Sequence, residues 1–244
     1  MPLYANDGAW RGANQIWIKQ DGEWVPITGV WVKQSGIWRQ VFGAGEGEVF
    51  ESGSGTLEIP EGVYSIRYTI IGGGSGGRNG AETDPYTSGS GGGSSGGLIT
   101  GIIDTNYGDS FSWSVGTGGA GGYAPTAPIA STFGAFTADA GNPPTGTGNH
   151  RYIGGAAPTG GVAGANGAFI AGDAGFVSGG KGGAIEGFGV GGAAGFGQGW
   201  GSAGTGYGAG GGGGGGYGAF KAQVPGYGGA GSNGVVIVEY NPAS

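Results

Sequence analysis

The stretch from Gly154 to Gly234 is dominated by glycine, and it limits what this chain can fold into. The chain has 70 glycines in 244 residues, roughly four times the usual share of about 7%. Ordering glycine costs more backbone entropy than ordering any other residue, so a flexible coil is its default state. A loop this long inside a compact domain is normally functional or disordered. An ordered state therefore requires unusually dense packing and hydrogen bonding.

The spacing of the glycines indicates one such packing. Polyproline II is a left-handed helix of about three residues per turn without internal hydrogen bonds. Glycine at every third place lets such helices approach closely and bond to one another. The glycines that fall three apart are Gly161, Gly164, Gly167; Gly189, Gly192, Gly195; Gly201, Gly204; and Gly210, Gly213, Gly216. Collagen is excluded because its period is strict and proline-rich, whereas this chain has only 11 prolines.

Large apolar side chains interrupt the glycines, as a linker would not require. They include Phe169, Phe176, Phe188, Phe196, Trp200, Tyr207, Tyr217, Phe220 and Tyr227. We therefore expect glycine-rich insertions packed as polyglycine-II helices, rather than a flexible coil. A homotrimer would supply more burial than a monomer can.

The N-terminal region, residues 1–42, contains an internal repeat. Ile16–Val25 recurs as Val30–Arg39, fourteen residues later. Each copy alternates apolar and polar residues around a turn, Asp21-Gly22 or Ser35-Gly36, which predicts a β-hairpin. We expect the two hairpins to make one small sheet with a tryptophan-rich face. That face is either a small core or a docking surface, and its residues are Trp17, Trp24, Trp31 and Trp38.

Residues 43–244 form the second predicted domain, an all-β sandwich that carries the glycine-rich region 154–234. Its best strand is Val63–Ile71, rich in β-branched and aromatic residues. The expected strands are Glu48–Glu51, Thr56–Ile59, Val63–Ile71, Leu98–Ile103, Ser110–Val115, Phe133–Thr137 and Gly234–Tyr240. We expect Leu98–Ile103 to pair with Ser110–Val115. The last strand, residues 234–240, is expected to close the sheet from the far end of the sequence.

Composition argues against several functions. The net charge is -7, so no basic patch is available to neutralise nucleic-acid phosphates. No apolar run approaches the ~18 residues that cross a membrane. The first residues lack the basic start and apolar core of a signal peptide. There is no cysteine, which removes disulfides and thiolate chemistry.

No motif predicts catalysis, a cofactor or a metal site. His150 is the only histidine, and one histidine needs several carboxylates to hold a metal. Asp104, Asp109, Asp139 and Asp173 lack EF-hand spacing. No glycine run ends in Gly-Lys-Ser/Thr, so no phosphate loop is indicated. We therefore expect a protein that is not an enzyme, with no cofactor.

Aromatic residues in glycine-rich loops are the better functional signal. A flat ring with a polar handle can stack on a sugar or anchor a protein interface. The alternative is that the same rings pack between glycine helices. The candidate contact residues are Tyr86, Tyr123, Tyr152, Phe176, Phe188, Trp200, Tyr207 and Tyr217.

Several stretches resemble phage tail proteins. Leu57–Gly74 resembles the opening strands of glycine-rich minor tail proteins, and Gly228–Tyr240 resembles their closing strand. The glycine-rich middle is similar to the tip adhesins of T-even-like phage fibres, which pack polyglycine-II helices. The Val32–Trp38 core of the N-terminal repeat is similar to short repeats of other tail proteins.

This resemblance implies a virion tail location, with assembly in the host cytoplasm. It implies a tail-fibre or tail-tip adhesin in which residues 1–42 dock on other phage tail proteins. The glycine-rich loops would then bind a host surface protein or glycan, and fibre proteins of this kind favour a homotrimer. The alternatives are a purely structural minor tail protein, an ice-binding protein and a glycan depolymerase. The last would need paired carboxylates.

Overall fold

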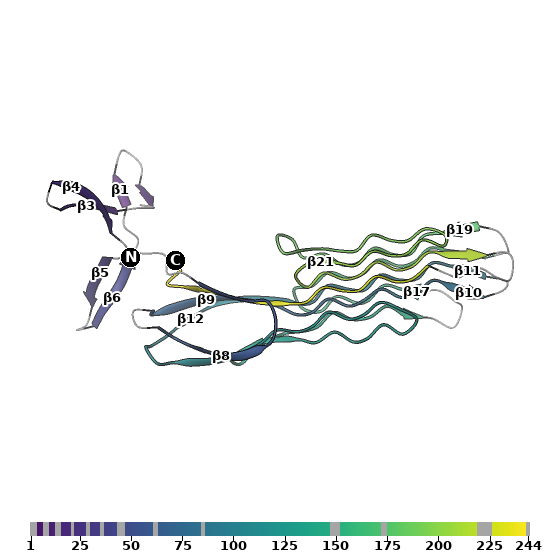
Figure 1. Ribbon diagram of the computed structural model, residues 1–244, viewed down its shortest axis with the longest axis horizontal. Helices are drawn as coiled ribbons and strands as arrows, with labels where there is room; N and C mark the ends of the chain where they lie inside the picture. The colour runs from purple at the N-terminus through teal and green to yellow at the C-terminus, as the bar shows by residue number, and fades with distance from the viewer. Residues whose placement is uncertain are drawn as a thin grey trace.

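The computed structural model describes residues 4–6, 10–12, 16–20, 22–27, 30–34, 37–42, 47–60, 63–83, 86–146, 152–171, 175–218 and 226–242. Across these ranges the regular elements are β-strands, without any helix, which confirms the all-β prediction. Small N-terminal hairpins lie at one end, followed by a sandwich of two sheets and a long bundle of undulating segments (Figure 1).

The N-terminal region forms three separate hairpins. Their strands are β1 (Tyr4–Asn6), β2 (Trp10–Gly12), β3 (Ile16–Gln20), β4 (Glu23–Ile27), β5 (Val30–Gln34) and β6 (Ile37–Phe42). Each repeat copy folds as a hairpin, as predicted, and Gly22 has the expected positive φ. The prediction of one shared sheet is wrong, because β3–β4 and β5–β6 are separate two-stranded sheets. Pro26 in β4 has no N–H to donate to a further strand. The Ser35-Gly36 turn lies outside the described residues.

The sandwich consists of two antiparallel four-stranded sheets. The first has the order β12-β9-β23-β7 and the second β15-β14-β13-β8. Their strands are β7 (Gly47–Phe50), β8 (Ser54–Glu58), β9 (Ser65–Ile71), β12 (Leu98–Asp104), β13 (Ser110–Ser114), β14 (Ser131–Phe133), β15 (Phe136–Ala138) and β23 (Val235–Tyr240). The closing strand β23 lies between β9 and β7, which confirms that the last strand joins the sheet of Val63–Ile71.

Two strand predictions are wrong. Strands β12 and β13 do not pair, because the turn at 105–109 carries the chain from the first sheet to the second. The expected strand Phe133–Thr137 is instead a hairpin, β14–β15. Its turn contains Gly134 with a φ of 55°, a conformation that residues with a side chain rarely adopt.

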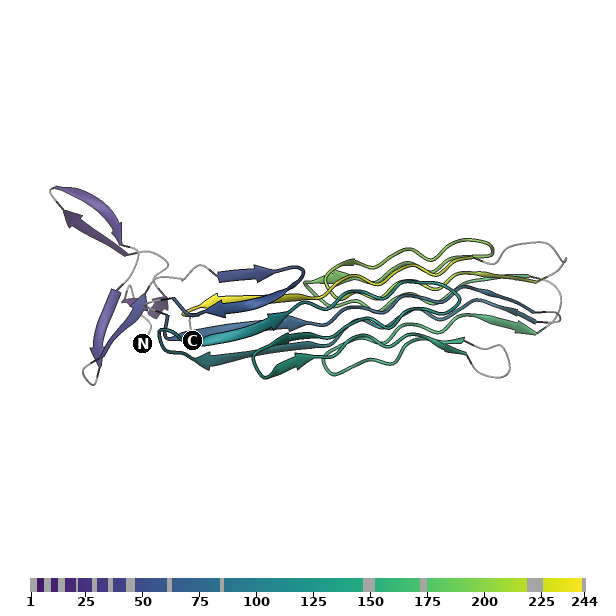
Figure 2. The same ribbon diagram turned by 60° about the horizontal axis from the view of Figure 1, so that its bottom comes forward.

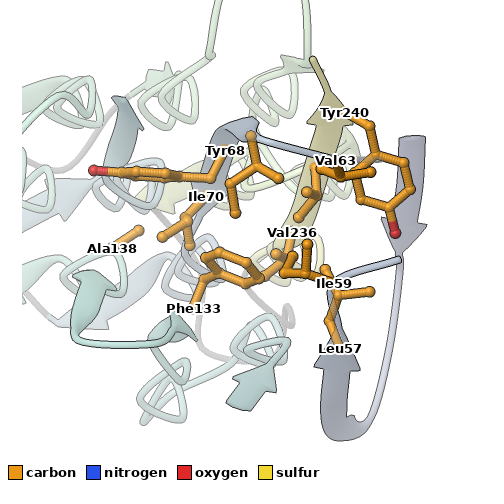
Figure 3. Close-up of a cluster of buried hydrophobic side chains, with 11 residues drawn as sticks. Leu57, Ile59, Val63, Tyr68, Ile70, Phe133, Ala138, Val236 and Tyr240 are labelled. Carbon is orange, nitrogen blue, oxygen red and sulfur yellow. The ribbon is translucent and has the colours of Figure 1, made fainter. Parts of the chain in front are cut away.

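The sandwich core is filled by side chains. Strand β9 alternates buried and half-buried residues, so that Ile66, Tyr68 and Ile70 face the second sheet. The fully buried Phe133 packs among them (Figure 3). At the edge of this core the Phe50 and Trp113 rings stack with centroids 4.1 Å apart. This alternation is the period-two pattern that the sequence shows.

Beyond the sandwich the chain forms the lattice, a set of glycine-rich segments that run side by side (Figure 2). Sandwich strands continue directly into several of these segments. Inside the segments most residues belong to no strand, although hydrogen bonds link the segments throughout. The segments are 72–80, 89–97, 116–122, 126–130, 139–143, 154–157, 161–168, 178–184, 191–195, 199–204, 208–215 and 226–234.

The lattice hydrogen bonds repeat every third residue. In segment 72–80, one set of amides bonds to segment 89–97 and a second set bonds to segment 226–234. The first set is Gly72 to Gly97, Ser75 to Ser94 and Arg78 to Gly91; the second is Gly74 to Ser232, Gly77 to Gly229 and Gly80 to Gly226. Within segments 72–80 and 89–97 no residue has a positive φ. A three-residue repeat with bonds only between segments is the polyglycine-II arrangement that the sequence predicts.

Three interior segments, 72–80, 89–97 and 208–215, contact one another and are each surrounded by others. Segment 208–215 exchanges backbone hydrogen bonds with six neighbours: 72–80, 89–97, 178–184, 191–195, 199–204 and 226–234. It is buried throughout, and Ala209 is its only residue with a side chain. Neither 72–80 nor 89–97 lies within the predicted glycine-rich region 154–234, so the lattice begins much earlier in the chain than expected.

The more sides of a segment are covered by other segments, the more positions in its three-residue repeat are glycine. Segment 161–168 lies at the surface and has glycine at one position in three. A Cβ on Gly164 or Gly167 would overlap a carbonyl oxygen of segment 89–97. The non-glycine positions of this segment carry exposed side chains, among them Val162 and Ala163. Interior segments have neighbours on all sides and are therefore mostly glycine, alanine and serine; the exceptions are Arg78 and Asn79 near the distal end of segment 72–80.

The sandwich and the lattice share one antiparallel register. Ile71 is opposite Leu98 at the end of the β9–β12 pair, and the Gly72 and Ser75 amides then bond to Gly97 and Ser94 without a shift. The pair β13–β14 likewise continues into the bond from Ile129 to Thr117. Glycine-rich strands specify register weakly by themselves. The side chains of the sandwich therefore fix the register for the glycines.

Candidate binding surface at the distal end

Short strands cap the distal end, defined as the end of the lattice away from the sandwich (Figure 1). They are β10 (Ala81–Thr83), β11 (Tyr86–Ser88), β16 (Thr145–Gly146), β17 (Tyr152–Ile153), β18 (Phe169–Ala171), β19 (Gly175–Val177) and β22 (Gly216–Gly218). Strands β10, β11 and β18 form one sheet, while β16–β17 and β19–β22 form two pairs. The register of the lattice continues into these strands, since Gly89 bonds to Ala168 beside the Ser88–Phe169 pair. The distal end is thus fixed to the sandwich through continuous hydrogen bonding.

Four of the eight candidate contact residues lie on these distal strands. Tyr86 is opposite Ala171, and Tyr152 is opposite Gly146. Phe176 in β19 is directly opposite Tyr217 in β22. The fold therefore brings predicted contact residues from four separate stretches of the sequence to one end of the molecule.

We name one group of exposed rings the distal aromatic patch: Phe176, Phe196, Trp200 and Tyr227. Their exposed fractions are 54%, 63%, 72% and 42%. The Phe176 and Phe196 rings lie tilted with centroids 5.9 Å apart. The Trp200 and Tyr227 rings meet edge to face at 5.2 Å. Such geometries are the favoured ones for aromatic pairs.

Hydrogen bonds of the lattice hold the backbone of this patch. The Gly199 amide donates to the Phe196 carbonyl at 2.7 Å and closes a tight turn between segments 191–195 and 199–204. Gly197 in that turn has a φ of 58°, and a Cβ there would overlap the Phe176 ring. The Gly201 amide donates to the Tyr227 carbonyl at 2.8 Å, which places Trp200 beside Tyr227. The patch is therefore built on ordered backbone.

Three other candidates lie elsewhere. Phe188 and Tyr207 are half-buried at the junction between sandwich and lattice, where they pack against a small core that contains Ile185. The Tyr207 hydroxyl donates to the Glu51 carboxylate, and this bond raises the pKa of Tyr207, with burial adding to the shift. Tyr123, 60% exposed, follows segment 116–122. For Phe188 and Tyr207 the packing role is the one the contacts support.

Two residues of the patch, Phe196 and Tyr227, were not among the predicted contacts. Both directly follow a glycine, as Trp200 does. The available signal was an aromatic residue isolated between glycines in 195–200 and 226–228. It did not reveal that these stretches are adjacent, because that depends on which lattice segments are neighbours.

The four tryptophans proposed for docking lie on the N-terminal hairpins. Trp17 is opposite Pro26 in the first repeat copy, and Trp31 is opposite Gln40 in the second. Trp24 and Trp38 are each opposite a lysine, Lys19 or Lys33. The two copies thus place their second tryptophan at equivalent positions.

The stretches of sequence that carry the distal aromatic patch have no charged side chain. Residues 175–180, 195–204 and 226–230, which carry and flank the patch, include no Asp, Glu, Lys or Arg. Within the described ranges, acidic residues and histidines form no cluster that could hold a metal ion. Asp173 and His150 lie outside those ranges. No helix long and apolar enough to cross a membrane occurs in the described part of the chain.

Comparison with known proteins adds no assignment. No protein-family model matches the chain, and a search of characterised proteins found no significant match.

Proposed function

We propose that this chain is an adhesin of a phage tail fibre or tail tip, which contacts the host cell surface through its distal end. The observation that carries the proposal is the polarity of the molecule. The repeat hairpins and the sandwich lie at one end of the molecule, and the lattice extends to the other (Figure 2). The exposed aromatic patch lies on lattice turns and on strand β19, away from the sandwich. Large exposed apolar groups are typical of interaction sites.

The lattice suits the role of a stiff support. Its amides and carbonyls bond between segments, as from Gly211 to Ser75 and from Gly213 to Gly180. A rigid support lowers the entropy that is lost when a distal surface binds a target. A flexible glycine coil of the same length would not hold a binding surface in a fixed orientation.

The proposal includes partners at both ends. Residues 1–42 dock on other phage tail proteins through the tryptophan-bearing hairpins, and the assembled form is a homotrimer in the virion tail. The partner at the distal end is a host surface protein or glycan. The role is binding and not catalysis.

Competition for adsorption tests the proposal with the intact protein. We expect the chain to be detected in purified virions by mass spectrometry, and the purified full chain to block virion adsorption when it is added to host cells first. Residues 1–42 alone serve as the control, because they carry only the proposed tail-docking hairpins. This fragment should leave adsorption by preassembled virions unchanged. Absence from virions would contradict the tail location. Presence without any block of adsorption would favour the purely structural tail protein.

Deletion of 154–234 is a poor test of receptor contact. It would remove interior segment 208–215 and segment 226–234, which accepts hydrogen bonds from segment 72–80. The remaining lattice would lose its packing, so failure to adsorb would report misfolding. Substitutions of exposed side chains avoid this problem.

A further inference from the structure

We infer that the distal aromatic patch binds an uncharged saccharide by stacking sugar rings on Trp200 and its neighbours. The inference deepens the proposed function, on which it rests for the source of the glycan at the host surface. It starts from the exposure of the rings, which ranges from 42% at Tyr227 to 72% at Trp200. Rings that are core residues would be covered, and none of these is.

The chemistry of the patch selects a neutral ligand. The residues that carry and flank the rings, 175–180, 195–204 and 226–230, include no charged side chain. An anionic polymer would therefore lose its hydration there without gaining an ion pair from these stretches. Arg78, whose backbone lies against Gly228 in the neighbouring segment, is half-buried. A sugar ring offers a face of C–H groups for the aromatic ring and hydroxyls for polar neighbours. The exposed Gln198 amide, the Trp200 indole N–H and the Tyr227 hydroxyl are such neighbours.

The surroundings of the rings argue against a protein partner or a second copy of this chain. Energetic centres of protein interfaces are ringed by further side chains that exclude water. Here Trp200 and Phe196 are flanked in sequence by Gly195, Gly197, Gly199 and Gly201, which offer no side chain for such a rim. A stable protein interface also covers about 800 Å² on each partner. A chain of sugar rings can instead engage the protruding rings one at a time.

The lattice preorganises the site. The backbone beside the rings is fixed by bonds from Gly199 to Phe196 and from Gly201 to Tyr227. Aromatic side chains have few rotatable bonds, so little conformational entropy is lost when they bind. The paired arrangement, with centroids 5.9 Å and 5.2 Å apart, restrains each ring further.

A glycan array with the full-length chain tests this inference, using neutral and anionic bacterial polysaccharides and oligosaccharides as probes. We expect binding to neutral glycans. Calorimetry with the best neutral glycan should show at least about tenfold weaker binding for Trp200→Ala and Tyr227→Ala. Trp200→Phe should keep part of the affinity, because it retains a ring. Tyr107→Ala is the matched control, since Tyr107 is 75% exposed but lies in the sandwich turn at 105–109, and it should bind as the wild type does.

Several outcomes would overturn the inference. The first is that the array shows no binding to any neutral glycan. The second is that the Trp200→Ala variant binds the glycan as tightly as the wild type and has the same melting temperature. Sedimentation velocity that shows self-association lost in Trp200→Ala would assign the patch to a second copy. A host protein bound by the wild type alone, without any glycan, would assign it to a protein.

The same variants separate this inference from the proposed host contact. If Trp200→Ala abolishes glycan binding while virions carrying it adsorb normally, the saccharide site stands and the host-contact role of the patch fails. If the full chain blocks adsorption but binds no neutral glycan, the adhesin proposal stands and the saccharide inference fails.

Discussion

The sandwich and the lattice both have buried interiors, but side chains fill the first and backbone fills the second. In the sandwich, side chains such as Phe133 and Ile66 occupy the space between the two sheets. In the lattice interior, backbone meets backbone, and a Cβ on Gly93 would overlap the carbonyl of Ser75. Hydrophobic burial stabilises the first region. Hydrogen bonds and close packing of the backbone stabilise the second.

This difference predicts opposite responses to mutation. Removing atoms should harm the sandwich, because it leaves a cavity. Adding atoms should harm the lattice, because the neighbouring backbone cannot move without breaking hydrogen bonds.

The largest effect is expected from Gly93→Val in the lattice interior. The new side chain would meet the backbone of Ser75 and Gly76, and we expect a loss of more than about 4 kcal/mol in the free energy of unfolding. Chemical denaturation measures it. Ala163→Val adds atoms at an exposed lattice position and should change stability by less than about 0.5 kcal/mol. Equal effects of the two substitutions would contradict a close-packed interior.

Phe133→Ala should destabilise the sandwich by about 3–4 kcal/mol, because the ring is fully buried. Phe136→Ala removes the same atoms from a residue that is 37% exposed, and about half that loss is expected. Thermal unfolding of both variants gives the comparison. A loss at position 136 as large as that at 133 would show that burial in this sheet pair does not control stability.

Ser94→Ala tests the polar contacts of the lattice interior. The buried Ser94 hydroxyl donates to the Ser95 carbonyl and accepts from the backbone amide of Asn142 at 2.7 Å. Its removal leaves that amide without its partner, and we expect a loss of about 1–3 kcal/mol. Ser202→Ala removes a similar acceptor from the Ala193 amide at the exposed surface, where water replaces it. Denaturant midpoints should therefore move clearly for position 94 and little for position 202.

The smallest effect concerns the junction between the two regions. The Glu51 bond raises the pKa of Tyr207 above its ordinary value of 10.0. The contribution of this bond to stability is therefore fully present below about pH 10 and is lost as the pH rises through the raised pKa. Tyr207→Phe should therefore lower the melting temperature slightly at about pH 8, and this difference should shrink as the pH rises above about 10. Burial also raises the pKa of Tyr240, and that contribution stays in both proteins. A wild-type advantage that grows with pH would contradict this contact.

The sequence predicted the sandwich better than the lattice for a physical reason. The pattern of apolar side chains indicates which residues are buried. The alternation in Ser65–Ile71 and the apolar run Val235–Tyr240 were therefore recognisable as core strands. A glycine indicates only that another part of the chain approaches its backbone closely, and not which part. The period of three was visible, but the neighbours of each segment were not, because glycine repeats are interchangeable. The neighbours follow from strands such as β9 and β23, whose side chains set the register.

The candidate site shows the same limit. Phe176 and Trp200 were predicted from their type and from the glycines around them, and both lie in the patch. Phe188 and Tyr207 have similar surroundings in the sequence but lie at the junction. Only the order of segments in the lattice separates the two groups, and no single residue encodes that order.

Amide hydrogen exchange across residues 208–215, compared with strands β9 and β23, tests the central claim most directly. Amides of this segment bond to neighbours on several sides, among them those of Gly210, Gly212 and Gly214. We predict that they exchange as slowly as the amides of β9, through global unfolding alone. Exchange at the rate of an unfolded chain, with β9 still protected, would show a flexible glycine spacer and contradict the lattice.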